Sequence, residues 1–258
     1  MLLHDHPFKI YKTLKGGFGM DTILQGHSNR RKSALIGGTA LIILALAAFF
    51  SYGFVHENLV LQGDATATFN NLKSSNMLFK AEIFGWTIIL ITDIVVTWAF
   101  YIFLEPINRS LALLAAWLRL TYTTILGVAI LNLVFVLLLS NGTDNLSSFN
   151  IDQLQANVML FLEAFETIWA IDLIIFGGHL MVIGLIISQS SKIPKVISTL
   201  LLLASAGYII INVFTAFFSQ YDEVISILKL IFNVPMILGE LGFGIWLLIR
   251  GGKISKPL

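Results

Sequence analysis

The sequence has no cysteine and little charge, and both absences narrow the classes of protein to which it can belong. None of the 258 residues is cysteine, which excludes a disulfide scaffold, a thiolate metal site and a cysteine nucleophile. Charged residues make up only 12% of the chain, against about 25% in ordinary globular proteins. Hydrophobic residues reach 57%, and the mean hydropathy is +0.85. So few polar side chains cannot cover a water-soluble surface, and the composition therefore indicates an integral membrane protein.

The charge that is present gives no case for a nucleic-acid partner. The formal net charge is +1, and the basic residues lie near the chain ends and in short loops, whereas nucleic-acid binding needs a concentrated basic surface. The partner that the composition predicts is the lipid bilayer.

Six apolar stretches are each long enough to cross a bilayer, which takes about 20 residues in a helix. They are Ser33–Val55, Ala81–Leu104, Leu111–Leu139, Ile168–Ser188, Lys195–Phe218 and Ile225–Ile249. The predicted fold class is therefore all-α, a polytopic bundle of six transmembrane helices. It occupies residues 30–251, between an N-terminal tail (1–29) and a C-terminal tail (252–258).

Two features near the N-terminus affect how the first stretch is interpreted. Arg30-Arg31-Lys32 before a short apolar core would also suit a signal peptide. The apolar run continues through Ala48-Phe49-Phe50 to Val55, which favours a span. Codons for Lys15-Gly16-Gly17 can spell a ribosome-binding site just upstream of Met20, so we predict that translation begins at Met20.

The distribution of basic residues predicts the orientation of the bundle, because cytoplasmic loops are enriched in lysine and arginine. Twelve such residues lie before the first span, in the second and fourth loops and after the last span: Lys9, Lys12, Lys15, Arg30, Arg31, Lys32, Arg109, Lys192, Lys195, Arg250, Lys253 and Lys256. Only Lys73, Lys80 and Lys229 fall on the other side. Both termini are therefore predicted to be cytoplasmic, in a bacterial cytoplasmic (inner) membrane.

Two outer loops are predicted to contain helix. Gly63-Asp64 opens the first loop, and Phe69, Leu72 and Leu78 suggest a short helix on the membrane surface. In the third loop, Asn150 and Gln153 form a capping-box pattern, which predicts a helix from Ile151 into the fourth span.

Four ionisable residues are predicted to meet near the middle of the membrane. At about 1.5 Å of rise per residue, they lie roughly 12 to 16 Å from the cytoplasmic ends of their spans. They come from four different spans: Asp93, Arg119, His179 and Glu240. Such residues are costly at membrane depth, and by default they suggest a functional site.

A second tier of polar residues lies closer to the predicted outer face. Its members follow helical spacing relative to the first four or to one another: Tyr122, Asp172, Tyr208, Asn212, Thr215 and Asn233. Together the two tiers predict a polar seam inside the bundle, with Glu82, Glu163 and Glu166 at its mouth.

Three interpretations of the seam stay open. It can bind a small ligand, an ion or a proton, which is our leading hypothesis. It can be a structural ion-pair knot in an accessory subunit, since intramembrane polar groups also hold helices together. It can be the site of an intramembrane enzyme using His179 with an acidic partner. No catalytic motif, metal site or cofactor site is recognisable, and His56 and the tail histidines His4, His6 and His27 are interpreted as solvated.

Several segments resemble one family, catalogued as domain of unknown function 4386. They are Glu105–Ala116, Gly63-Asp64 with Ala65–Asn70, Phe176-Gly177 through Gly184-Leu185-Ile186, Pro194 through Gly207-Tyr208, and Gly239-Glu240-Leu241 through Trp246-Leu247-Leu248. The resemblance covers roughly Arg30 to Gly251. It implies a multi-pass bacterial membrane protein, and it supplies no substrate, cofactor or catalytic residue.

Overall fold

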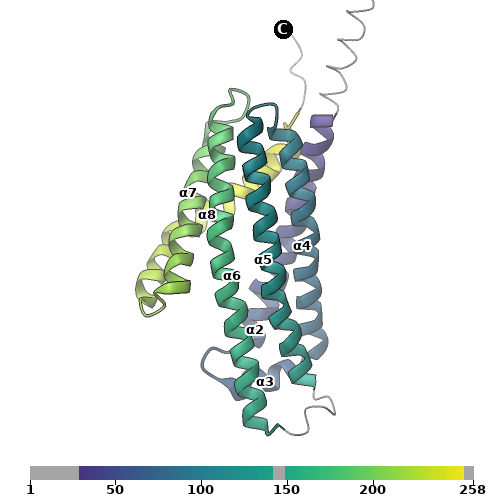
Figure 1. Ribbon diagram of the computed structural model, residues 1–258, viewed down its shortest axis with the longest axis vertical. Helices are drawn as coiled ribbons and strands as arrows, with labels where there is room; N and C mark the ends of the chain where they lie inside the picture. The colour runs from purple at the N-terminus through teal and green to yellow at the C-terminus, as the bar shows by residue number, and fades with distance from the viewer. Residues whose placement is uncertain (1–28, 142–148, 253–258) are drawn as a thin grey trace, which may run out of the picture.

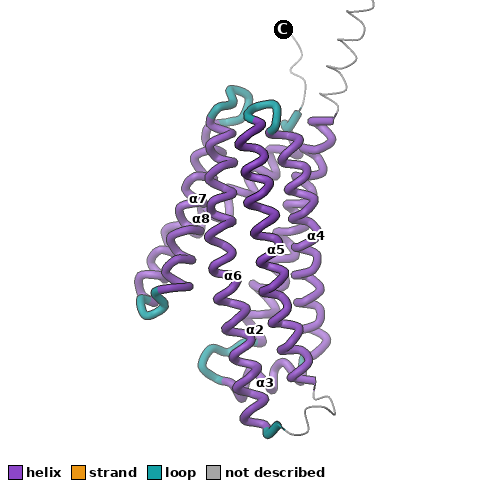
Figure 2. The backbone as a smooth tube through the Cα atoms, viewed as in Figure 1, coloured by secondary structure: helices purple, strands orange, loops and turns teal. Residues whose placement is uncertain are grey.

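A computed structural model describes residues 29–141 and 149–252 of the chain. Helices and the loops between them make up all of this part, which contains no strand (Figure 2). Six of the helices are long and apolar enough to span a membrane, which confirms the predicted fold class. The predicted tails and the predicted start at Met20 lie almost entirely outside the described residues.

The six spans are longer than the apolar stretches that predicted them. The first span, Asn29–Leu59, includes a π-helical section, η1 (Phe49–His56), and one short turn, α2 (Glu57–Leu59). After α3 (Ala65–Ser74) come the other spans, α4 (Asn76–Leu104), α5 (Arg109–Asn141), α6 (Ile151–Ser188), α7 (Lys195–Phe217) and α8 (Asp222–Ile249).

Helices α4, α5 and α6 reach further at one end of the bundle than the α7–α8 hairpin does (Figure 1). Helices α4, α5 and α6 have 29, 33 and 38 residues, which gives lengths of about 43, 50 and 57 Å against an apolar membrane core of about 30 Å. Helix α6 begins at the predicted capping box, in which the Asn150 side chain accepts from the Gln153 N–H and the Gln153 side chain accepts from the Asn150 N–H. The sequence therefore predicted this extension correctly.

Helix α3 lies at the same end of the bundle (Figure 1). The Asp64 side chain accepts from the Ala67 N–H at 2.8 Å and caps the helix, just after Gly63 turns the chain with a φ of +80°. Phe69 and Leu72 are buried against the bundle, where α3 contacts α5 and α6. The predicted helix is present, and protein covers Phe69 and Leu72 on its apolar face.

Helices that follow one another in the chain are neighbours in the bundle, and the last helix returns to the first span. The first span packs on α4, and α4, α5, α6, α7 and α8 pack in that order. The Arg31 guanidinium donates to the carbonyls of Leu247, Leu248 and Gly251 at 3.0, 2.7 and 2.7 Å. At the opposite end the α7–α8 hairpin diverges from α6 (Figure 1), so it is attached to the bundle mainly at its Arg31 end.

Glycine permits the close approach of α6 and α7 at Gly177 and Gly184. A Cβ atom at Gly177 would lie 2.6 Å from Ile209 Cγ1 and 3.1 Å from the Ser205 carbonyl oxygen. A Cβ at Gly178, by contrast, would meet only Leu118 Cδ1, at 3.9 Å. Gly178 therefore has room for a side chain, whereas Gly177 does not.

These two neighbouring glycines provide a matched test of the interface. We expect Gly177→Leu to lower the free energy of unfolding by about 1–3 kcal/mol, because overpacking forces the two backbones apart. Gly178→Leu, where space is available, should change it much less. The measurement is unfolding in mixed detergent micelles, and equal losses in the two variants would contradict the close contact.

Candidate functional site

The guanidinium of Arg119 joins carboxylates from two other helices. Its Nη2 and Nε atoms lie 2.6 and 2.9 Å from Oδ1 of Asp93 in α4, and Nη1 lies 2.7 Å from Oε1 of Glu240 in α8. The side chains of Arg119 and Asp93 are fully buried, and that of Glu240 is 15% exposed. The sequence left open which acid Arg119 faces, and the structure shows that it faces both.

His179 is the fourth member of this group, which we call the Arg119 cluster (Asp93, Arg119, His179 and Glu240). Its Nδ1 lies 2.8 Å from the carbonyl oxygen of Ala115, and its Nε2 lies 3.2 Å from Arg119 Nη1. A carbonyl only accepts and a guanidinium only donates, so Nδ1 carries the proton and Nε2 accepts. His179 is therefore a neutral imidazole that fixes the guanidinium. All four residues predicted at one membrane level are in contact.

Aromatic rings cover the cluster. Arg119 Cζ lies 5.5 Å from the ring centroid of Phe176 and 5.8 Å from that of Phe100, both within cation–π distance. The same two rings lie roughly parallel to the His179 ring, at centroid distances of 5.9 and 6.4 Å. This packing limits the access of water to the ion pairs and holds the guanidinium in one orientation.

A cavity of about 380 Å³ lies next to the cluster. It reaches Glu240 at one end and Glu166 and Lys229 at the other. Most of the predicted second tier lines it, namely Tyr122, Tyr208, Thr215, Asn212 and Asn233. Part of the predicted polar seam therefore lines one cavity, and of the three glutamates predicted at its mouth only Glu166 is among the lining residues.

Asp172 does not belong to the cavity lining. Its side chain is fully buried, and neither carboxyl oxygen has a hydrogen-bond partner among the described residues. The seven-residue spacing places it on the face of α6 that carries His179, but no hydrogen bond or ion pair to a described residue joins it to the Arg119 cluster. The structure thus contains a carboxyl group without a counter-charge deep in the bundle.

A second polar group, which the sequence analysis missed, surrounds His56. His56 is only 4% exposed, so its interpretation as solvated was wrong. Its Nδ1 lies 2.8 Å from Glu82 Oε1, and its Nε2 lies 3.2 Å from Glu166 Oε1. Because ionised carboxylates only accept, this arrangement suits an imidazolium with a proton on each nitrogen.

A group of aromatic residues packs around this His56 group. The Tyr52 ring stacks on the His56 ring at 5.3 Å, and it meets Trp169 edge-on at 4.6 Å. Trp86 lies 5.1 Å from Trp169, and its Nε1 donates to Glu82 Oε1 at 3.4 Å. Tyr52, Trp86 and Glu166 also line the cavity, so the cavity joins the His56 group to the Arg119 cluster.

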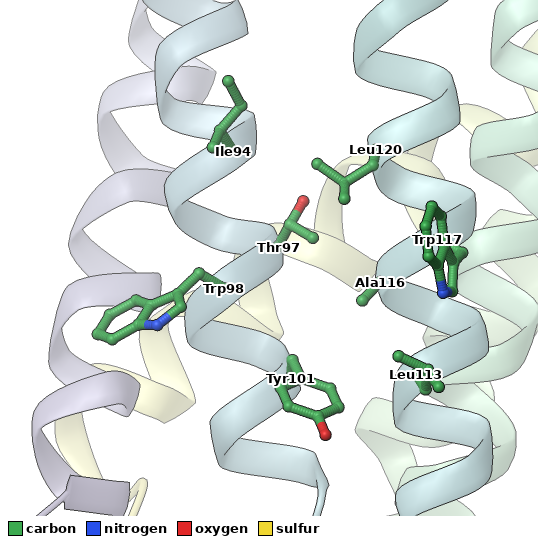
Figure 3. A pocket seen from close by; sticks show the side chains of 8 residues that line it. All are labelled: Ile94, Thr97, Trp98, Tyr101, Leu113, Ala116, Trp117 and Leu120. Carbon is green, nitrogen blue, oxygen red and sulfur yellow. The ribbon is translucent and has the colours of Figure 1, made fainter.

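A second hollow, of about 330 Å³, faces outward between α4 and α5 (Figure 3). Its lining is apolar, and the side chains of Trp98 and Trp117 beside it are 51% and 62% exposed. In a bilayer, lipid tails would fill such a groove. The cavity between the two polar groups, which has several polar lining residues, is therefore the stronger candidate for a site.

Arg119 is the residue on which the central ion pairs depend. We expect Arg119→Leu to lower the free energy of unfolding by about 3–5 kcal/mol, because it leaves two buried carboxylates without a partner. Adding Asp93→Asn and Glu240→Gln should recover much of that loss. Tryptophan fluorescence during unfolding in mixed micelles measures both effects, and an unchanged unfolding free energy in Arg119→Leu would contradict this role.

His56 provides an independent test at the other polar group. We expect His56→Leu to lower the free energy of unfolding by about 3–5 kcal/mol, because Glu82 then lies buried without its partner. The double variant His56→Leu/Glu82→Gln should be more stable than His56→Leu alone. A solvated histidine would give the opposite pattern, in which neither change matters.

Comparisons with known proteins place this architecture in a family. A family model described as "Domain of unknown function (DUF4386)" matches residues 36–251. An uncharacterized protein of the archaeon Archaeoglobus fulgidus is 28% identical over 175 residues, which are 68% of this chain and 86% of the relative. No solved structure matches the chain. Because the family model reaches from the first span to the end of α8, the chain belongs to the DUF4386 family of multi-pass membrane proteins.

Proposed function

We propose that this protein is a non-enzymatic membrane protein that binds a small solute in the cavity beside the Arg119 cluster. One observation carries the proposal, namely that the cavity reaches from Glu166 and Lys229 to the Glu240 carboxyl group. Its volume of about 380 Å³ lies in the range of small-molecule sites. An ion-pair knot that served only to hold helices together would need no such cavity beside it.

The hydrogen bonds of His179 support a non-enzymatic role. Both ring nitrogens are engaged, one by Arg119 and one by the Ala115 carbonyl, so neither is free to act as a base. His179 is also absent from the cavity lining. Over residues 29–141 and 149–252, no group of three histidine, aspartate or glutamate side chains is suited to hold a metal ion.

The positions of the charged residues support an orientation in which the cavity opens outward. Seven basic residues lie at the end of the bundle where the described chain begins and ends: Arg30, Arg31, Lys32, Arg109, Lys192, Lys195 and Arg250. We infer that this end faces the cytoplasm and that the opposite end, with α3 and the His56 group, faces outward. A bacterial cytoplasmic membrane, which the family resemblance implies, suits this arrangement.

The absence of cysteine allows the cavity to be tested directly. Asn233 lines the cavity, while the adjacent Val234 does not and is 60% exposed toward the predicted lipid. We expect N-ethylmaleimide to label Asn233→Cys about tenfold faster than Val234→Cys, because the reactive thiolate forms in water and not in apolar surroundings. Labelling rates are measured on the purified protein in lipid nanodiscs. Equal rates, or an unreactive Asn233→Cys, would contradict the proposal.

A further inference from the structure

At the inner end of the cavity, acidic groups outnumber basic groups among the residues that the structure describes. Asp93 and Glu240 bring two carboxyl groups to the single positive charge of Arg119, and His179 is neutral because of its hydrogen bonds. Net charge is expensive at membrane depth, so this end of the cavity favours an occupant that brings positive charge.

The outer end of the cavity does not share this imbalance. Glu82 and Glu166 lie against His56, and both ring nitrogens of His56 face them. Lys229 lines the cavity from the first half of α8 and provides a second positive charge. With His56 protonated, two acids and two bases balance there. A cation would therefore be attracted past the mouth toward Glu240.

The walls of the cavity suit an organic cation better than a metal ion. Six aromatic side chains line it: Tyr52, Trp86, Tyr122, Trp169, Phe176 and Tyr208. Aromatic faces attract ammonium groups, whereas calcium needs six or more oxygen ligands close together. The only carboxylates in the lining, Glu166 and Glu240, belong to opposite ends of the cavity.

We propose that the cavity takes a small organic monocation, an amine or quaternary ammonium with an apolar body, and that Glu240 is its counter-ion. Glu240 Oε1 accepts from Arg119, while Oε2 has no hydrogen bond to any described residue. The side chain is 15% exposed and lines the cavity. Its second oxygen is therefore available to the cation while the first holds Arg119 in place.

The face of α8 that lines the cavity leads to this counter-ion. Lys229, Asn233, Met236 and Glu240 all line the cavity and follow the three- and four-residue spacing of one helix face. The ammonium group would approach Glu240, and its apolar body would contact Met236 and the aromatic walls. This inference rests on the proposed function, because it names the class of solute for the same cavity.

A matched pair of ions tests the sign of the charge. In Asn233→Cys, we expect benzyltrimethylammonium to slow N-ethylmaleimide labelling in a saturable manner and benzenesulfonate, an anion of similar size, to have no effect. Equal protection by both ions, or protection by neither, would overturn the organic-cation proposal. If the cysteine of Asn233→Cys reacted no faster than that of Val234→Cys, the proposed cavity site itself would be overturned. The two failures are therefore distinguishable.

Variants test the counter-ion and the walls. In the Asn233→Cys background, Glu240→Gln should weaken protection by at least about tenfold, because the cation loses its charged partner. Glu163→Gln is the control, since Glu163 is exposed and absent from the cavity lining. If Glu240→Gln does not fold, Trp169→Leu removes an aromatic wall and leaves the ion pairs intact. Unchanged protection in the folded variant would overturn the assignment.

Discussion

The bundle is organised around one positive charge that cannot reach water. A guanidinium at membrane depth is tolerated only with partners that accept its hydrogen bonds, and Arg119 has these partners on three other helices. Asp93, His179 and Glu240 thereby tie α4, α6 and α8 to α5. The ring stacking of Phe100 and Phe176, the tautomer of His179 and the position of α8 all follow from this requirement. Arg31 and His56 add polar contacts near the two ends of the bundle, and the hydrogen bonds to the guanidinium fix the relative position of four helices between them.

The α7–α8 hairpin differs from the rest of the bundle in how it is held. Arg31 binds the last carbonyls of α8 at one end, Glu240 binds Arg119 near the middle, and glycines allow close contact between α6 and α7. Beyond Glu240 the hairpin diverges from α6 (Figure 1), and the cavity lies beside this part of it. The polar lining of the cavity and the ion pairs of Arg119 therefore both result from the way in which α8 is held. A helix that must deliver Glu240 to Arg119, yet is not packed closely along its outer half, leaves space beside it.

Much of this structure could be predicted from the sequence, because the relevant rules are local. Apolar length predicted six spans, and the constant rise of a helix placed Asp93, Arg119, His179 and Glu240 at one level. The same rules could not give the order of helices around the bundle, so the partner of Arg119 stayed open. They also failed for His56, which lies near the end of a span, where histidines are usually solvated. A useful signal was present, because consecutive antiparallel spans bring the end of the first close to the start of the second, where Glu82 lies. Helical spacing placed Asp172 on the correct face of α6 but could not show that it lacks a partner.

The π-helical section of the first span has a consequence for how that helix can be interpreted. Residues Phe49–His56 complete each turn with more residues than an α-helix does. The faces of the helix before and after this section are therefore out of phase, and no single helical wheel describes both. Ala40 and Leu41 are buried before this section, and Val55 and His56 are buried at its end. The change in winding thus lets the first half of the span pack against one neighbour while His56, at its end, faces Glu82. The local winding of the backbone, rather than the choice of side chain alone, decides that a histidine at this position points inward.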